Sequence, residues 1–197
     1  MSWRPPPGER PYAWDARRLA LENSRFRIYA DALTQPNGDH VPDYLVVEPK
    51  SMRSAGLSGA MILPVRDNAY YLLRIYRHPV DAWTWEAPGG FVDDGEQPEV
   101  AARRELYEET GLHCAQPDML DLGRIHPVPG LANACIALFA AQNCLLDENA
   151  PIDEEIGVVE GRWFSEAEML EMAAKPGGVM DGPTLQAFFL YQLRHQK

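Results

Sequence analysis

Three glutamates in the middle of the chain have a spacing that suits a metal-binding site. The segment from Pro98 to Gly111 is expected to form a helix, because proline suits the first turn and glycine suits the left-handed position after the last. On that helix Glu105, Glu108 and Glu109 occupy positions i, i+3 and i+4 and share one face. Three like charges on one face need a compensating cation, and Mg²⁺ takes oxygen ligands and pairs with substrate phosphates. The alternative is a solvated acidic helix face.

The residues around these glutamates follow a pattern with fixed gaps. It runs as Gly90, five residues, Glu96, seven residues, Arg104-Glu105-Leu106, one residue, Glu108-Glu109, one residue, and Gly111-Leu112. This pattern resembles the box of the Nudix hydrolase family at every defined position. The resemblance implies an α+β fold, a Nudix α/β/α sandwich with a mixed β-sheet, in which the box forms a loop–helix–loop. Glu96 and Arg104 are expected to pair and to orient the metal ligands.

The resemblance also implies which residues hold the metal. Glu105 and Glu109 are expected to be the main Mg²⁺ ligands, with Glu108 sharing a second ion, and Mn²⁺ is an alternative metal. The backbone carbonyl of Gly89 is expected to be a further ligand. Metal at this position would stabilise charge while water attacks one phosphorus of a diphosphate.

Apolar patterning predicts the elements that must position the box. Strands are expected at residues 58–65, 70–76, 119–124, 134–141 and 158–164. A capping-box spacing from Ser165 to Glu168 predicts the start of a helix, and residues 183–195 are expected to form an amphipathic C-terminal helix. Strands and helices therefore mix without strict alternation, which agrees with the fold that the resemblance implies.

The first quarter of the chain is expected to lie outside the hydrolase core. Residues 1–12 are rich in proline and arginine and suggest an arm, and residues 13–23 are expected to form a short helix. Turn residues between two apolar runs predict a β-hairpin over about residues 25–48. The predicted divisions are an N-terminal arm with a short helix (1–23), an N-terminal β-hairpin extension, to which the resemblance assigns dimerisation (24–50), and a Nudix domain (51–197).

Three runs outside the box resemble the ADP-ribose or ADP-sugar pyrophosphatase branch of the family. They are residues 76–79 (YRHP), 85–90 (WEAPGG) and 129–133 (PGLAN). This branch implies Mg²⁺-dependent hydrolysis of the pyrophosphate bond of ADP-ribose or a related ADP-sugar, giving AMP and a sugar phosphate. Two alternatives stay open: hydrolysis of GDP-mannose or another nucleoside diphosphate derivative, and a non-catalytic Nudix-fold nucleotide sensor. A third possibility is an acidic interaction module without catalytic activity, whose function would not depend on a metal.

The same branch implies five substrate-binding residues. Arg77 is expected to contact the phosphates, a task that suits the paired donors of a guanidinium group. Glu86 would bind substrate or brace the loop, and Phe91 is a further candidate. In a homodimer, Phe26 and Tyr44 are expected to stack on the base held by the partner chain. The alternative for both rings is packing within the hairpin.

The general base is expected on the acidic loop before the last strand, at residues 153–155. The resemblance favours Glu154, which is also a candidate metal ligand, and places Glu155 second. Ile152 and Gly157 depart from the pattern of the branch, so the choice within the loop stays open. The alternative is a solvated acidic loop.

Composition limits the partners. The 197 residues carry a net charge of −11 at pH 7, which disfavours binding to nucleic acid polymers. A small nucleotide-sugar substrate is compatible with that charge, because a bound metal reverses the local sign. The three cysteines lack metal-ligand spacing, no apolar run reaches the length of a membrane span, and the N-terminus lacks the apolar core of a secretory signal. We therefore expect a cytoplasmic protein with free thiols and no membrane partner, and the family resemblance adds the expectation of a homodimer.

Overall fold

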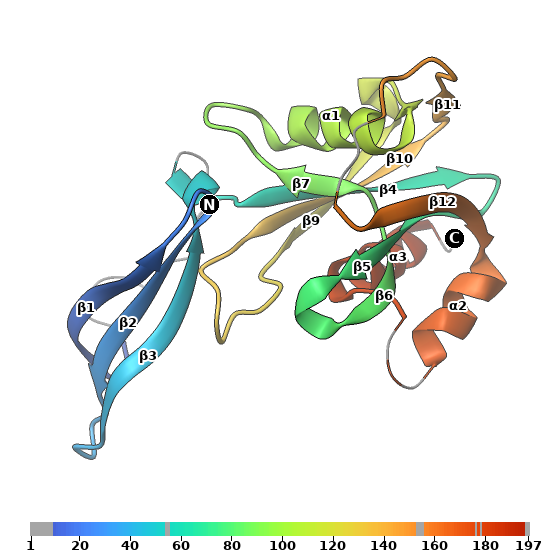
Figure 1. The fold of residues 1–197 in the computed structure, drawn as a ribbon. Coiled ribbons are helices and arrows are strands. Elements are labelled where there is room, and N and C mark those ends of the chain that lie inside the picture. Colours follow the sequence, from blue (N-terminus) through green and yellow to red (C-terminus); the bar gives the residue numbers. More distant parts are fainter. Residues whose placement is uncertain (1–9, 54–55, 153–155, 176, 178, 196–197) are drawn as a thin grey trace.

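A mixed β-sheet with helices on both sides forms the centre of the chain (Figure 1). The structure is a computed structural model, and it describes residues 10–53, 56–152, 156–175, 177 and 179–195. The sheet consists of β4 (Gly59–Arg66), β5 (Ala69–Arg77), β6 (Ala82–Glu86), β7 (Gly89–Phe91), β9 (Met119–Ile125), β10 (Ile136–Gln142) and β12 (Val158–Ser165). Its order is β12-β5-β4-β10-β9, with β6 beside β5 and β7 beside β4. The β4–β10 pair is parallel and the other pairs are antiparallel.

Helices cover both faces of this sheet. The helix α1 (Pro98–Thr110) lies on one face, and α2 (Glu166–Ala174) and α3 (Gly182–His195) pack on the other (Figure 1). The remaining short elements are η1 (Lys50–Arg53), η2 (His78–Val80), η3 (Gln116–Asp118), β8 (Leu112–His113) and β11 (Leu145–Leu146). This arrangement confirms the predicted α/β/α sandwich. The predicted strands are also confirmed, because β4, β5, β9, β10 and β12 match them to within two residues at each end.

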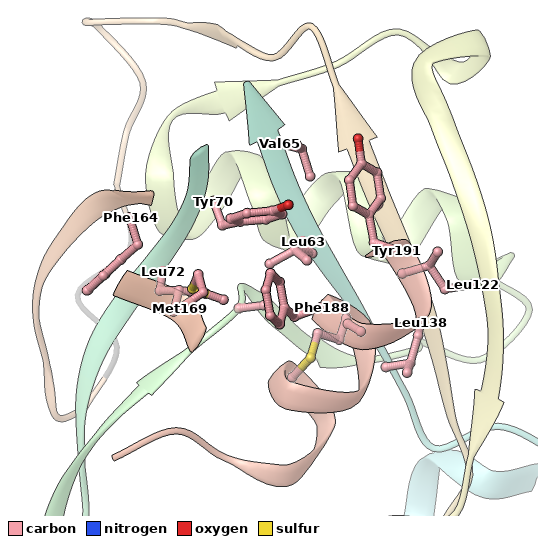
Figure 2. Close-up of a cluster of buried hydrophobic side chains, with 14 of the residues drawn as sticks. Leu63, Val65, Tyr70, Leu72, Leu122, Leu138, Phe164, Met169, Phe188 and Tyr191 are labelled. Carbon is pink, nitrogen blue, oxygen red and sulfur yellow. The ribbon is translucent and has the colours of Figure 1, made fainter. Parts of the chain in front are cut away.

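The strand β4 is an almost unbroken apolar run because both of its faces are buried. Successive side chains point to opposite faces of a sheet. Leu63 therefore packs with Phe188 of α3 in one core cluster (Figure 2), whereas Ile62 packs with Leu106 of α1 in the other. All four side chains are completely buried, and each contributes about 1.5–3 kcal/mol from burial alone. The two clusters hold α1 and α3 in fixed positions relative to β4.

The ends of the helices follow the local sequence signals. In α1, Pro98 occupies the first turn, and Gly111 follows the last turn with a φ of 70°. The Gly111 N–H donates to the carbonyl of Tyr107, which closes the helix as predicted. In α2, the Ser165 side chain accepts from the N–H of Glu168 and the Glu168 carboxylate accepts from the N–H of Ser165. The predicted capping box is therefore confirmed.

A separate antiparallel sheet extends away from the sandwich at the N-terminal end (Figure 1). The strands β2 (Phe26–Thr34) and β3 (His40–Pro49) form the predicted hairpin, which is confirmed. The helix predicted over residues 13–23 is wrong, because β1 (Ala13–Glu22) pairs along the length of β2. Arg17 donates two hydrogen bonds to the Asp31 carboxylate, at 2.8 and 2.7 Å, and so fixes this pairing across the sheet. Such long-range pairing outweighs the helix preference of alanine and leucine.

All ten residues of β1 are exposed. They include the large apolar side chains Trp14, Leu19 and Leu21, which are 40%, 48% and 52% exposed. Among the residues that the structure describes, no helix is both long enough and apolar enough to cross a bilayer.

Candidate active site

Two glycines of β7 let the carboxylates of α1 approach the sheet closely. Gly89 pairs with Met61 of β4, and its N–H donates to Oε2 of Glu109 at 3.0 Å. A Cβ atom on Gly89 would lie 2.6 Å from the carbonyl oxygen of Ala60, and one on Gly90 would overlap the Glu105 carboxylate. A side chain at position 89 would therefore push β7 away from β4, and one at position 90 would displace the Glu105 carboxylate.

Arg104 connects the loop before α1 with the carboxylates on the helix. Its guanidinium donates to both oxygens of Glu96 at 3.1 Å and to the carbonyl of Phe91 at 3.1 Å. Its Nη1 also donates to Glu105 at 2.8 Å and to Glu108 at 3.0 Å. The predicted pairing of Arg104 with Glu96 is confirmed, whereas the two further ion pairs were not expected. The hydrogen bonds from Arg104 lower the pKa of Glu96 and keep it ionised.

Four of the five predicted metal ligands lie around one pocket, and the fifth, Glu154, falls outside the described residues. Gly89, Glu105, Glu108 and Glu109 all line a cavity of about 520 Å³ between β7 and α1. Carboxylate and carbonyl oxygens are the donors that Mg²⁺ and Mn²⁺ accept, so the chemistry of this set fits such an ion. Within the part of the chain that the structure describes, no three acidic, histidine or cysteine side chains are grouped closely enough to hold one ion. The positive charge between Glu105 and Glu108 comes from Arg104.

A second pocket adjoins the first and shares its glycine wall. It has a volume of about 380 Å³, and Gly89, Gly90 and Phe91 line both cavities. Its charged lining residues are Arg77, Glu86 and Asp181. Arg77 donates to both oxygens of the buried Glu86, at 2.9 and 2.8 Å, so Glu86 fixes the guanidinium at this pocket. The structure thus brings together the predicted substrate-binding residues Arg77, Glu86 and Phe91.

The two aromatic residues predicted to stack on a base lie apart from each other. Phe26 packs edge-on against Phe91 of the same chain, with ring centroids 5.9 Å apart. The guanidinium of Arg25 lies over the Phe91 ring, 5.5 Å from its centroid. Tyr44 lies on β3, where its hydroxyl donates to the carbonyl of Gly130 at 3.0 Å. Within one chain, Phe26 is therefore the ring that reaches the wall of the pocket.

Asp181 is a residue of the second pocket that sequence reasoning missed. Its Oδ1 accepts from the N–H of Thr184 at 3.1 Å, which caps the start of α3. The Thr184 hydroxyl accepts in turn from the N–H of Ala87 at 2.8 Å, two residues before Gly89. The local sequence Asp-Gly-Pro-Thr indicates a helix cap, but it carries no sign that the carboxylate lines a pocket formed by β4, β7 and the ends of β5 and β6. Burial raises the pKa of Asp181 to about 6.

We expect Asp181→Asn to stabilise the protein at neutral and alkaline pH. Because the pKa of Asp181 is raised in the folded state, ionisation of this group removes stability as the pH rises from about 4 to about 6. A shift from 3.8 to about 6 corresponds to at most about 3 kcal/mol. Asparagine keeps the cap to Thr184 and carries no charge. Urea unfolding at pH 4 and pH 8 measures the effect, with the exposed Asp94→Asn as the matched control.

A stability difference that does not change between pH 4 and pH 8 would contradict this assignment of the Asp181 pKa. So would an equal effect of Asp94→Asn.

The candidate bases Glu154 and Glu155 lie outside the described residues. Ile152 and Ile156, which flank this segment in the chain, line a cavity of about 670 Å³ together with Glu109. Gly157, where the related pattern has a glutamate, has a φ of 93°, and a Cβ there would lie 2.6 Å from the carbonyl oxygen of Tyr76. This departure from the pattern thus has a steric reason.

Comparisons with known proteins agree with this geometry. The NUDIX domain family matches residues 57–186. A CMP-5'-(N-acetyl-N-hydroxy-3-aminopropyl)phosphonate hydrolase of Streptomyces rubellomurinus is 40% identical over 94 residues, which cover 46% of this chain and 41% of that protein. The ADP-ribose pyrophosphatase of Bacillus subtilis is 26% identical over 129 residues, which cover 65% of each chain. The match therefore spans less than two thirds of either relative.

A solved structure described as an ADP compounds hydrolase has the same fold. The two chains superpose with a TM-score of 0.74 at 19% sequence identity, and the match covers 94% of each chain. The N-terminal sheet and the sandwich both fall within that coverage.

Proposed function

Because this chain belongs to the Nudix family, we propose that it hydrolyses the pyrophosphate bond of a nucleoside diphosphate sugar, with ADP-ribose or a related ADP-sugar as the preferred substrate. The products would be AMP and a sugar phosphate. The observation that carries the proposal is the pair of adjoining pockets that share Gly89, Gly90 and Phe91. One pocket is lined by three glutamates and the other by Arg77, so a diphosphate bound across the glycines would contact both.

The acidic pocket would hold the divalent metal. Mg²⁺, or Mn²⁺ in its place, would be bound by Glu105, Glu109 and the Gly89 carbonyl, with Glu108 contributing to a second ion. Bound there, the metal would neutralise phosphate charge and make water more acidic. Arg104 holds Glu105 and Glu108 by ion pairs at 2.8 and 3.0 Å, and it thereby orients their carboxylates.

The second pocket would bind the rest of the substrate. Glu86 fixes the Arg77 guanidinium with two hydrogen bonds, so Arg77 would meet a phosphate without reorganising. Phe91 offers a ring at the boundary between the pockets. We propose Glu154 as the general base, with Glu155 as the second candidate. The cavity that Ile152, Ile156 and Glu109 share supports a base on this loop, because it lies beside the proposed ligand Glu109.

We also propose that the protein is a homodimer formed through the N-terminal sheet. The exposed apolar side chains Trp14, Leu19 and Leu21 on β1 support this, because exposed apolar surface commonly marks an interface. In the dimer, Phe26 and Tyr44 would contribute to the partner's substrate site.

Light scattering on the full-length protein is expected to give twice the mass of one chain at micromolar concentration. Leu19→Glu and Leu21→Glu together should yield the monomer, because they place charge at exposed apolar positions of β1. Glu99→Gln, on an exposed position of α1, serves as the control. A full-length protein that is monomeric at that concentration would refute the dimer.

A substrate panel with and without Mg²⁺ tests the proposed activity. It should contain ADP-ribose, ADP-glucose, GDP-mannose, NADH, a diadenosine polyphosphate, a deoxynucleoside triphosphate and a CMP-linked phosphonate. We expect the highest kcat/KM with ADP-ribose or ADP-glucose, and AMP as the nucleotide product. A preference for GDP-mannose would show that the enzyme recognises guanine and not adenine. Binding of a nucleotide without turnover of any compound would instead favour a sensor.

A further inference from the structure

Cys114 and Cys144 face each other at the end of the β8–β11 ladder. In this antiparallel pair, Leu112 is opposite Leu146 and His113 is opposite Leu145. The next position of the same register places Cys114 opposite Cys144. Both residues are buried, with exposures of 4% and 3%, and both belong to the core cluster beside α1. Directly opposite residues of an antiparallel pair have Cβ atoms about 4.5–5.5 Å apart on the same face, so the two side chains lie next to each other.

We propose that Cys114 and Cys144 form a redox-active pair that a hydroperoxide converts to a disulfide. Cys114 attacks the peroxide oxygen as a thiolate, which breaks the O–O bond, releases an alcohol or water and leaves Cys114 as a sulfenic acid. The sulfur of Cys144 then attacks the sulfur of Cys114 and displaces water. The two thiols together lose two electrons and two protons, and the hydroperoxide takes up these electrons and protons to give an alcohol and water, or two waters from hydrogen peroxide.

The surroundings of the pair make the two cysteines unequal. Cys114 lines a cavity of about 310 Å³ with Arg103 and His113, so a small oxidant has a route to its sulfur. The hydrogen bond from Cys144 and the charge of Arg103 lower the pKa of Cys114, against the effect of burial and of Asp118. The same hydrogen bond and burial raise the pKa of Cys144. Cys114 is therefore the attacking thiol and Cys144 the resolving one.

The thiol proton of Cys144 has a second acceptor. Its sulfur lies 3.6 Å from the carbonyl oxygen of Ala141. This contact can hold the Cys144 proton while the sulfur of Cys114 is oxidised.

The third cysteine provides an internal control. Cys135 is buried with an exposure of 8%, and burial raises the pKa of its thiol. It lies on the segment before β10, where its backbone N–H and carbonyl bond to Ser58. Burial alone thus does not distinguish Cys135 from the pair, whereas a neighbouring thiol and a cavity do.

The test treats the full-length protein with hydrogen peroxide and maps its peptides by mass spectrometry without reducing agent. We expect the loss of two hydrogen atoms from the chain, a linked peptide pair containing Cys114 and Cys144, and full reversal by dithiothreitol. Cys135→Ser should behave as the unaltered protein does. Cys144→Ser should accumulate a sulfenic acid at Cys114 that dimedone traps, and Cys114→Ser should form no disulfide.

Oxidation of Cys135 at the same rate as Cys114 would overturn the proposal. So would a linked peptide that includes Cys135, or the persistence of all three thiols when peroxide already oxidises methionine. Peptide mapping of the unaltered chain reports each of these outcomes even where a serine variant folds poorly. The result is also independent of nucleotide hydrolysis, because no substrate is present.

Discussion

Glu109→Gln is expected to lower kcat by at least about a hundredfold while the fold stays intact. Glu109 accepts from the N–H of Gly89 at 3.0 Å, and the side-chain oxygen of glutamine can accept the same bond. The substitution therefore keeps the contact between α1 and β7 and removes only the charge. That charge is the one required of a metal ligand beside the diphosphate.

Steady-state kinetics in saturating Mg²⁺ and a thermal unfolding curve together measure these two effects. Glu99→Gln on the exposed first turn of the same helix is the control, and it should retain full activity. A kcat close to that of the unaltered enzyme would remove Glu109 from the ligand set, whatever the substrate.

Arg104→Lys is expected to lower kcat/KM by about tenfold to a hundredfold, although it keeps the charge. The guanidinium bonds to Glu96, Glu105, Glu108 and the Phe91 carbonyl at once. A lysine ammonium has three donors on a flexible stem and cannot reproduce this geometry. Three carboxylates would then lose their common partner, and the loop before α1 would lose its connection to the helix.

The same substitution should reduce the free energy of unfolding by about 1–3 kcal/mol. We expect this loss of unfolding free energy to lie toward the lower end of that range, because the Arg104 side chain is 29% exposed and solvent screens its ion pairs. Arg103→Lys is the matched control, since it changes the adjacent exposed arginine of α1. If Arg104→Lys and Arg103→Lys have the same kinetics, the ion pairs of Arg104 do not orient the carboxylates.

The features that could be predicted from the sequence are those determined by near neighbours in the chain. The bounds of α1 follow from Pro98 and Gly111, and the Glu96–Arg104 pair follows from one loop and one helix. Five strands of the sheet follow from apolar runs because burial on both faces leaves few polar positions.

The features that could not be predicted depend on segments far apart in the chain. β1 lacks a regular alternation of apolar and polar residues, and its conformation depends on pairing with β2. Asp181 has a local role as a helix cap, and only the folded chain places it beside Arg77 and Glu86. The contacts of Arg104 with Glu105 and Glu108 depend on side-chain conformations that spacing does not determine. The choice between Glu154 and Glu155 stays a prediction.

The parallel pairing of β4 with β10 has a consequence for synthesis of the protein on the ribosome. Ser58, just before β4, bonds to Cys135, just before β10, and 77 positions separate them in the chain. At typical translation rates, β10 emerges roughly 4 to 15 seconds after β4. Throughout that interval one edge of the buried strand β4 has no partner, whereas β5 and β7 cover the other edge as soon as they emerge. The nascent chain is therefore most exposed to aggregation, and most dependent on chaperones, between the completion of α1 and the arrival of β10.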